Sequence, residues 1–236
     1  MVNRVVTETT GNSGTEALSS PIDLPSIPDV IYGALRKDIA RGVYKPGPIR
    51  VRAIAERFGV SATPVREALR RLEAEGLVSL RNRQIVVNPL SLREMHEIYT
   101  IRGELESFAL RQAAPHAAED PELLAKLESL VDDMDRFERS PEEWRAANED
   151  FHLLLYRKAQ MPRLEQIIDL LWVAVEPYLR LYVSTAKNFR AAQSQHRLLL
   201  RHLTAGEFDE AAVVMREHLR GTEQLLAQGL SDAERT

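Results

Sequence analysis

The stretch "SATPVREALRRLEAEGLV", residues 61–78, decides how the N-terminal part of the chain is interpreted. Ser61 is a candidate helix N-cap, and Pro64 is tolerated in a first helical turn, where no intrahelical N–H bond is lost. The apolar spacing predicts a helix that buries one face, formed by Val65, Ala68, Leu69 and Leu72. Arg66 and Arg70 lie one turn apart on the exposed side, near the free N–H groups of the helix start. The helix is therefore suited to binding an anion.

The charge of the chain is divided unevenly along its length. The net charge is −4, but residues 28–88 contain twelve Lys and Arg against six Asp and Glu, a local charge of +6. Residues 89–236 contain eighteen Lys and Arg against twenty-six Asp and Glu, a local charge of −8. Because the field near a surface depends on local charge, this pattern indicates a basic, anion-binding module joined to an acidic part with another task.

The segments around the quoted stretch predict a winged helix-turn-helix. A first helix should run from Pro28 to about Gly42, and a second should cover 51–59 after a turn at "YKPGP". The β-rich runs 77–80 and 84–87 should pair as a hairpin. In a winged helix-turn-helix, the second helix of the pair lies in the major groove, so the expected anion is DNA. The alternative is that the arginines form only the solvated face of an amphipathic helix.

The string "VSATPVREALRRLEAEGLV" and the residues around it closely resemble the DNA-binding domain of GntR-type bacterial transcription regulators. The resemblance implies operator contacts from Arg52, Ser61, Thr63 and Arg66, and minor-groove contacts from Asn82 and Arg83 at the hairpin tip. Two positions depart from the family pattern. Ala62 stands where the family usually has Arg, and Gln84 where it usually has Gly, so one DNA contact is missing and the turn of the wing differs.

The composition limits the class of protein. The chain has no cysteine, which excludes disulfides, thiolate metal sites and thiol nucleophiles. The N-terminus lacks the apolar segment of a secretory signal, and no apolar run approaches the length that spans a bilayer, so we expect a cytoplasmic protein without a membrane partner. Residues 1–26 predict a disordered tail, 27–88 the DNA-binding domain and 89–230 an all-helical domain.

The chain after Asn88 is expected to be entirely helical. Capping boxes at Ser91 and Ser140 and a capped start at Asp120 mark three helix N-termini. Many of the helices have one apolar stripe, which favours an antiparallel bundle. Six helices are predicted, near 91–114, 121–138, 141–159, 163–185, 188–204 and 207–228. The predicted fold class is therefore mostly α, a winged helix-turn-helix followed by an antiparallel six-helix bundle.

Three histidines on three predicted helices point toward the interior of this bundle. His152 shares a helical face with Asn148, four residues earlier. His196 and His218 are flanked by apolar residues at helical spacing. Any one of them alone is interpreted as a buried neutral histidine with one satisfied hydrogen bond. The remaining histidines, taken as surface or structural residues, are His96, His116 and His202.

Residues 89–236 also resemble the helical effector domain called FCD, which follows this DNA-binding module in the FadR branch of the family. Many such domains bind a divalent metal through an Asp or Asn four residues before an "FH" histidine, together with two further histidines. The resemblance implies a metal site formed by Asn148, His152, His196 and His218. Three imidazoles and an amide suit Zn²⁺ or Ni²⁺. Asn in place of the commoner Asp removes a negative charge and should weaken metal binding.

Arg102 stands where the resembling domains carry an arginine that pairs with an acidic effector. Tyr99 and Glu106 share its helical face. The resemblance implies a small carboxylate effector that is bound by the metal, Arg102 and Tyr99. The alternative is an Arg102–Glu106 ion pair on the helix surface.

Together these features predict a homodimeric transcription regulator, expected to be a repressor, that binds a near-palindromic double-stranded DNA operator and responds to a small carboxylate. Two alternatives stay open. A metal with three histidine ligands and an open position could belong to a hydrolase of a small acid, although the sequence has no HExxH arrangement and no obvious general base. A regulator of the same fold could instead bind a long-chain ligand such as an acyl-CoA, without a metal.

Overall fold

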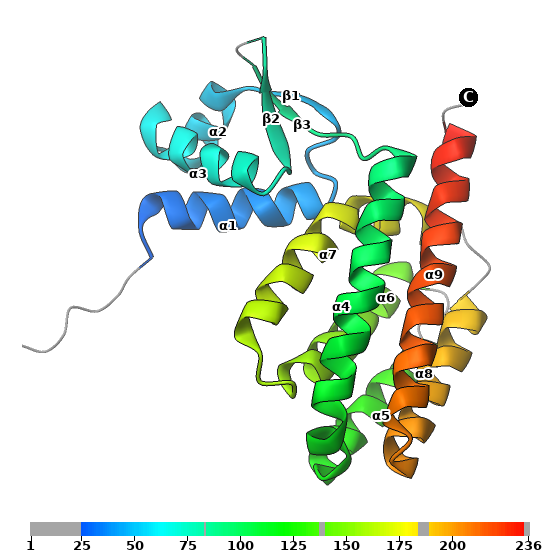
Figure 1. The fold of residues 1–236 in the computed structure, drawn as a ribbon. Helices are drawn as coiled ribbons and strands as arrows, with labels where there is room; N and C mark the ends of the chain where they lie inside the picture. The colour runs from blue at the N-terminus through cyan, green and yellow to red at the C-terminus, as the bar shows by residue number, and fades with distance from the viewer. Residues whose placement is uncertain (1–24, 83, 137–139, 184–188, 234–236) are drawn as a thin grey trace, which may run out of the picture.

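The computed structural model describes residues 25–82, 84–136, 140–183 and 189–233. Within these ranges a small N-terminal unit of helices and strands sits across one end of a helical bundle (Figure 1). The predicted fold class, a winged helix-turn-helix followed by a helical bundle, is confirmed. The expected tail, residues 1–26, lies outside the described residues except for Pro25 and Ser26.

The three helices of the N-terminal unit have clear local start and stop signals. Helix α1 (Ile27–Ala40) begins with a capping box between Ser26 and Asp29. Helix α2 (Val51–Phe58) ends at Gly59, whose left-handed φ of 65° favours glycine. Helix α3 (Ala62–Ala74) is the helix of the quoted stretch, with Ser61 as N-cap. The hydroxyl of Ser61 makes no capping hydrogen bond, so it is available to an external partner.

The sheet has one strand more than the predicted hairpin. Strands β2 (Val78–Arg81) and β3 (Gln84–Val87) pair as expected, but β1 (Gly47–Ile49) pairs with the other side of β3. The strand β1 falls within and after the predicted turn "YKPGP". Pro48 has no N–H to donate, and an edge strand tolerates it because only one of its sides is paired. The wing is therefore attached to the segment that leads into α2.

The N-terminal unit has its own apolar core. The predicted buried face of α3 is confirmed, since Val65, Ala68, Leu69 and Leu72 are all at most 1% exposed. They pack against the apolar face of α1 and against the sheet, in a cluster that also includes Ile31, Leu35, Ile39, Ile54, Val78 and Val87. This packing fixes the exposed face of α3 relative to the wing.

The second unit consists of six helices within the described residues. They are α4 (Leu92–Ala118), α5 (Pro121–Arg136), α6 (Pro141–Arg157), α7 (Pro162–Val183), α8 (Phe189–Ala205) and α9 (Phe208–Ala233). Their number and order match the prediction. Helices α4 and α9 run side by side along the bundle (Figure 1). None of the helices in the described ranges is long and apolar enough to cross a membrane.

Helix α4 extends four residues past its predicted end. The predicted helix ends near residue 114, whereas the structure continues the helix to Ala118 through Pro115, which cannot donate an intrahelical hydrogen bond. Ala113, Ala114 and Ala117 are fully buried on this last part of the helix. Tertiary packing of this small-residue face offsets the bond lost at the proline.

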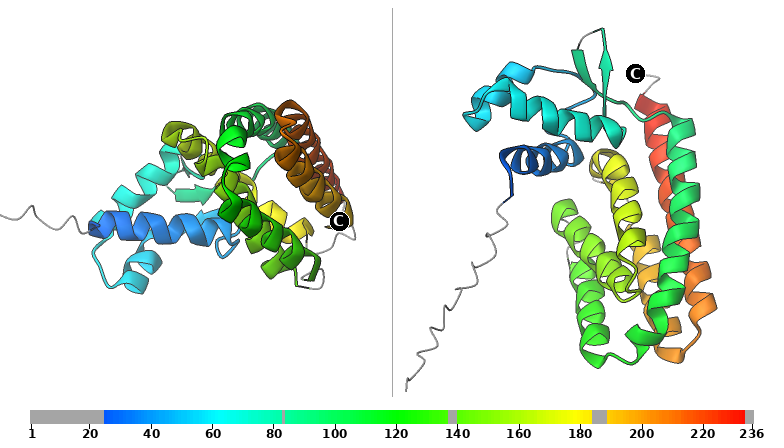
Figure 2. Two further views of the ribbon diagram at one scale, coloured as in Figure 1. Left: turned by 90° about the horizontal axis from the view of Figure 1, so that it is seen from below. Right: turned by 60° about the vertical axis from the view of Figure 1, so that its left-hand side comes forward.

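Helix α7 connects the two units. Val173 and Ala174 pack against the core of the N-terminal unit, whereas Ile168 and Val175 belong to the core of the bundle. Figures 1 and 2 show α7 next to α1 at the end of the bundle. The backbone N–H of Leu90, in the linker before α4, donates to the hydroxyl of Tyr178 on α7. One helix thus contacts the N-terminal unit, the linker and the bundle interior.

Candidate functional site

Three buried histidines meet inside the bundle. His152 comes from α6, His196 from α8 and His218 from α9, and they are 1%, 0% and 5% exposed. One potential ligand nitrogen from each lies within 4.8 Å of the others, and the Nε2 atoms of His152 and His196 are 3.4 Å apart. Two nitrogens bound to the same Zn²⁺, each at about 2.1 Å, are about 3.0–3.4 Å apart. The spacing therefore fits a shared metal ion.

The tautomer of His152 is set by a tyrosine. Its Nδ1 lies 3.2 Å from the hydroxyl of Tyr156, and that hydroxyl donates to Oε2 of Glu106 at 2.5 Å. Because the hydroxyl proton is used by Glu106, the hydroxyl oxygen accepts from Nδ1–H of His152. The lone pair of Nε2 is thereby left for the cluster, which is the orientation that metal-binding histidines require.

Two glutamines set the other two histidines in the same way. Nδ1 of His196 lies 3.1 Å from Oε1 of Gln193, and the amide nitrogen of Gln193 donates to a carbonyl and a carboxylate of α5. Nδ1 of His218 lies 3.1 Å from Oε1 of Gln195. Each amide oxygen accepts from Nδ1–H, so the proton stays on Nδ1 and Nε2 is free to bind an ion.

Asn148 adds an oxygen donor on the same helix as His152, one turn earlier. Its Oδ1 is buried and has no hydrogen-bond partner among the described residues. An unpaired buried carbonyl oxygen is costly, and a bound cation would satisfy it. The four residues implied by the resemblance thus fit a divalent metal in their donor chemistry, and the three histidines also fit in their spacing.

Burial keeps the histidines neutral. It is the largest cause lowering the pKa of His152 and of His196 well below the ordinary value, and the charges of neighbouring histidines lower it further. Burial, followed by the charge of Arg102, lowers the pKa of His218 to about 4. A neutral imidazole can donate its lone pair to a metal, so the cluster is ready for a cation at neutral pH.

The metal-free protein should lose stability on acidification. The unfolded chain protonates His218 near its ordinary pKa of 6.5, whereas the folded protein resists protonation down to about pH 4. The free energy of unfolding should therefore fall as pH decreases from about 6.5 toward 4, by about 3 kcal/mol from this residue. Urea unfolding at several pH values measures the effect. His218→Asn should reduce the pH dependence, with the remainder coming from His152 and His196, and His202→Asn should leave it unchanged; equal slopes in both variants would contradict the assignment.

The pair formed by Arg102 and Glu106 is buried. The two side chains are 2% and 0% exposed, with Nε of Arg102 donating to Oε1 of Glu106 at 2.6 Å. The alternative of an ion pair on the helix surface is therefore wrong in its location, although the pair itself exists. Nε1 of Trp172 donates to the same Oε1 at 3.0 Å. The guanidinium lies 4.8 Å from the ring centre of Tyr99 and 4.6 Å from that of Trp172.

Two donors in this region have no partner within the described part of the chain. Nη1 of Arg102 and the hydroxyl of Tyr99 are buried without a hydrogen bond among the described residues. Burial is the largest cause raising the pKa of Tyr99 to about 12, so its hydroxyl keeps its proton. Burial is the largest single influence and would lower the pKa of Arg102, but the charge and hydrogen bond of Glu106, together with Tyr99 and Tyr156, outweigh it and raise that pKa, so the guanidinium stays charged. Both groups can donate to an anion.

The histidine cluster and the arginine belong to one continuous buried site. The Tyr156 hydroxyl contacts both Glu106 and His152, and the ring of Trp172 lies 5.7 Å from that of His152. Sequence reasoning missed four residues of this site, namely Tyr156, Trp172, Gln193 and Gln195. Tyr156 and Gln193 lie one turn from a histidine on the same helix, and this spacing was the available signal.

The arginines of α3 differ in their contacts. Arg71 is engaged internally, since its guanidinium donates to Asp29 at 2.5 Å and lies 3.9 Å from the ring centre of Tyr32. Arg66, in contrast, lines a hollow of about 510 Å³ together with Arg52. The residues expected to contact the operator, Arg52, Ser61, Thr63 and Arg66, are all exposed and lie on α2, on α3 or at the start of α3.

The wing presents Asn82 at its tip. Asn82 is exposed and has a left-handed φ of 49°, a conformation that asparagine tolerates better than most residues. Gln84 begins β3 and pairs with Arg81, so the departure from the family glycine is accommodated in the strand. Arg83, the other expected minor-groove residue, lies outside the described residues.

The remaining histidines are away from the cluster. His96 pairs with Glu223 at 2.7 Å, and His202 pairs with Glu207 at 2.7 Å. His116 is exposed at the end of α4. Their interpretation as surface or structural residues fits these positions.

Comparisons with known proteins agree with both units. Residues 28–86 match the family described as bacterial regulatory proteins, gntR family, and residues 97–221 match the FCD domain. The chain is 31% identical over 172 residues to the HTH-type transcriptional regulator McbR of Escherichia coli (strain K12). These aligned residues cover 70% of this chain and 77% of McbR. It is 27% identical over 210 residues to the HTH-type transcriptional repressor GlaR of the same strain, covering 85% and 96%. The solved structure of E. coli McbR/YncC has a TM-score of 0.76 at 28% identity, covering 88% of this chain and all of that one.

A winged helix-turn-helix joined to a helical domain of this kind defines a bacterial transcriptional regulator. The chain belongs to the GntR family and carries an FCD domain. These relatives are named as transcriptional regulators, which favours a regulator over the hydrolase alternative.

Proposed function

We propose that this protein is a homodimeric, cytoplasmic repressor that binds a near-palindromic DNA operator and releases it when a small carboxylate binds at a metal site. Residues 27–88 form the DNA-binding domain, and residues 89–230 bind the effector and the second protomer. The observation that carries the proposal is the cluster of three neutral histidines whose Nδ1 atoms each have an acceptor, beside a buried arginine with an unused donor.

The DNA side of the proposal rests on exposed, uncommitted groups at the start of α3. Arg66 would contact base edges, and the Ser61 and Thr63 hydroxyls and the free N–H groups would bind phosphate. Arg52 on α2 and the wing residues Asn82 and Arg83 would add backbone and minor-groove contacts. Two protomers would place their α3 helices about 34 Å apart, one turn of DNA. Repression is supported by the relative GlaR, which is named a repressor.

The metal-binding part of the proposal rests on the four residues that can supply ligand atoms. Asn148, His152, His196 and His218 would hold Zn²⁺ or Ni²⁺, which acts as a Lewis acid and leaves positions for oxygen ligands. All four donors are uncharged, so the full double charge of the ion remains to attract an anion. A carboxylate on the ion could also accept from Nη1 of Arg102 and from the hydroxyl of Tyr99, neither of which has a hydrogen-bond partner among the described residues.

Two measurements test the proposal. Elemental analysis of protein purified without chelator or nickel affinity resin should show about one Zn or Ni per chain. Selection from a random-sequence duplex pool should yield a near-palindromic site, and binding to it should weaken when Zn²⁺ and a small carboxylate are added. If the purified protein carried no metal and took up none, the proposed metal site would be ruled out. If the protein bound no duplex at low salt, the proposed DNA-binding function would be ruled out.

Replacing Arg66 by alanine should weaken binding to the selected duplex by about 1–3 kcal/mol, because a bidentate contact to a base is lost. Fluorescence anisotropy at moderate salt measures the change. Arg157→Ala, an exposed arginine at the end of α6, is the matched control and should leave affinity unchanged. Equal affinities of the wild type and Arg66→Ala would contradict the assignment of α3 as the recognition helix.

A further inference from the structure

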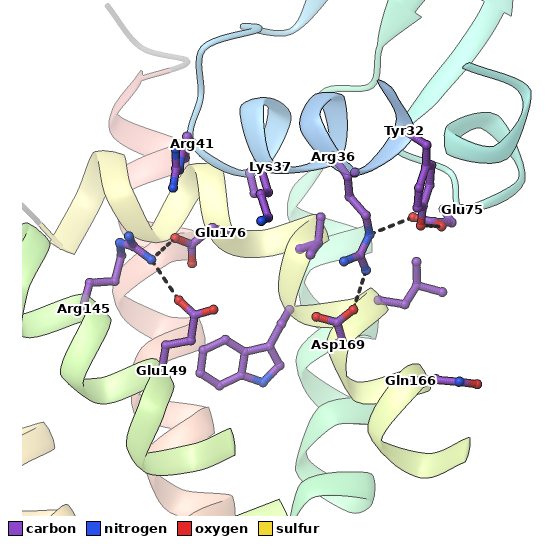
Figure 3. A pocket seen from close by; sticks show the side chains of 15 residues that line it. Tyr32, Arg36, Lys37, Arg41, Glu75, Arg145, Glu149, Gln166, Asp169 and Glu176 are labelled. Carbon is purple, nitrogen blue, oxygen red and sulfur yellow. Dashed lines mark hydrogen bonds and ion pairs between the residues drawn. The ribbon is translucent and has the colours of Figure 1, made fainter. Parts of the chain in front are cut away.

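A cleft of about 610 Å³ lies between α1 of the N-terminal unit and helices α6 and α7 of the bundle (Figure 3). Its charges differ by side. Helix α1 contributes the cations Arg36 and Lys37, its C-cap residue Arg41 contributes a third, and the bundle contributes the carboxylates Glu149, Asp169 and Glu176. Arg145 of α6 pairs with both Glu149 and Glu176. Asp169 instead pairs across the cleft with Arg36.

Arg36 contacts two elements at once. Its Nε donates to Oε2 of Glu75 at 3.1 Å, and its Nη2 lies 2.8 Å from Oδ2 of Asp169. Figure 3 shows both contacts from the one guanidinium. Glu75 is the C-cap residue of α3 and also accepts from the hydroxyl of Tyr32. A single side chain of α1 therefore joins the end of the recognition helix to α7.

On α7, Asp169 lies one turn before Trp172, the residue that contacts the buried site. The indole of Trp172 donates to Glu106 and stacks on Arg102, and Trp172 also lines the cleft. Within a rigid helix, residues three apart move together. A displacement of Trp172 therefore displaces the carboxylate that Arg36 binds.

We infer that Arg36 is a positioning residue that transmits the state of the buried site to α3, with Asp169 as its partner on α7. The inference rests on the proposed function. A carboxylate that accepts from Nη1 of Arg102 alters the charge balance around Glu106 and with it the contacts of Trp172. Helix α7 then takes a different position against α1, and the double contact of Arg36 carries the end of α3 with it. The ligand acts because it binds one of the two packings more tightly.

The Arg36–Asp169 contact can be removed without breaking the core. The Asp169 side chain is 53% exposed, and ion pairs of such exposure contribute little to stability. Asp169→Asn keeps the shape of the side chain and removes its charge. Asp132→Asn is a matched control, because Asp132 is 46% exposed and pairs with Arg197 on the bundle surface, between α5 and α8 and away from the cleft.

The experiment measures the affinity for the selected duplex of metal-free protein and of protein with Zn²⁺ and succinate. The wild-type ratio should be about fivefold or more, as is typical of coupled sites. In Asp169→Asn the ratio should fall to within about twofold of one, and in Asp132→Asn it should stay at the wild-type value. Combining Asp169→Asn with Arg36→Gln should change the ratio no further than Arg36→Gln alone, because Arg36→Gln already removes the contact with Asp169.

Loading of the buried site is followed separately by tryptophan fluorescence, to which Trp172 contributes as one of two tryptophans in the chain. Zn²⁺ should quench or shift this fluorescence at the same concentration in the wild type and in Asp169→Asn. If Asp169→Asn keeps the full wild-type ratio, the inference is overturned and the proposed function stands. If the wild type binds Zn²⁺ and its duplex affinity does not respond, the proposed regulation fails and the inference fails with it.

Discussion

Replacing His196 by alanine is expected to abolish Zn²⁺ binding and to leave the metal-free protein folded. His196 supplies one of the three histidine nitrogens that lie within 4.8 Å of one another, and it is completely buried. Loss of an orienting partner of a metal ligand already costs about 10- to 100-fold in affinity, so loss of a ligand should exceed about 100-fold. Isothermal titration with Zn²⁺ measures the affinity, and circular dichroism reports the fold. The response of duplex binding to Zn²⁺ and succinate should be lost with the metal.

His202→Ala is the control for this variant. His202 lies on the same helix but pairs with Glu207 at the surface. Its replacement should leave Zn²⁺ affinity unchanged. If His196→Ala bound Zn²⁺ as the wild type does, the three histidines would be ordinary core residues and the metal site would have to be abandoned.

The second large effect is expected from Glu106→Leu, which should destabilise the protein by about 3–5 kcal/mol. Glu106 is 0% exposed and accepts from Arg102, Tyr156 and Trp172. Removing the carboxylate leaves the charge of Arg102 buried and uncompensated, which is more costly than losing the pair as a whole. Thermal and urea unfolding measure the loss. Zn²⁺ affinity should also fall, because Tyr156 no longer fixes the tautomer of His152.

Glu104→Gln provides the comparison on the same helix. Glu104 is 66% exposed and pairs with Arg216 at 3.3 Å on the surface. Its replacement should change the free energy of unfolding by no more than about 0.5 kcal/mol. A similar cost for both variants would mean that the buried charges around Arg102 are not coupled as the contacts indicate.

The local signals of the N-terminal unit were sufficient to predict its helices. The glycine after α2, the N-cap Ser61 and the apolar spacing of α3 all act within a few residues of the chain, and the structure follows them. Strand β1 could not be predicted in this way. It contains a proline and exists because β3, about forty residues later, offers it a free edge.

The candidate site was predictable in its ligand-type residues and not in their surroundings. Helical spacing and the family resemblance pointed to the histidines, and the structure brings all three together. The burial of Arg102 was not predicted, because the weak amphipathic pattern of α4 does not distinguish a buried ion pair from a surface pair four residues apart. Trp172 was missed because its contact with Glu106 joins helices 66 residues apart in sequence.

Helix α4 is the first element after the wing in the chain and has 27 residues, a length of about 40 Å. The segment just before its N-terminus is held by the hydrogen bond from the backbone N–H of Leu90 to the hydroxyl of Tyr178. A rod of that length acts as a lever, and a tilt of roughly 5° about the anchored end displaces the far end by roughly 3 Å. The proposed response to a ligand should therefore be visible as small angular differences between liganded and free states, best seen after superposition on the N-terminal unit.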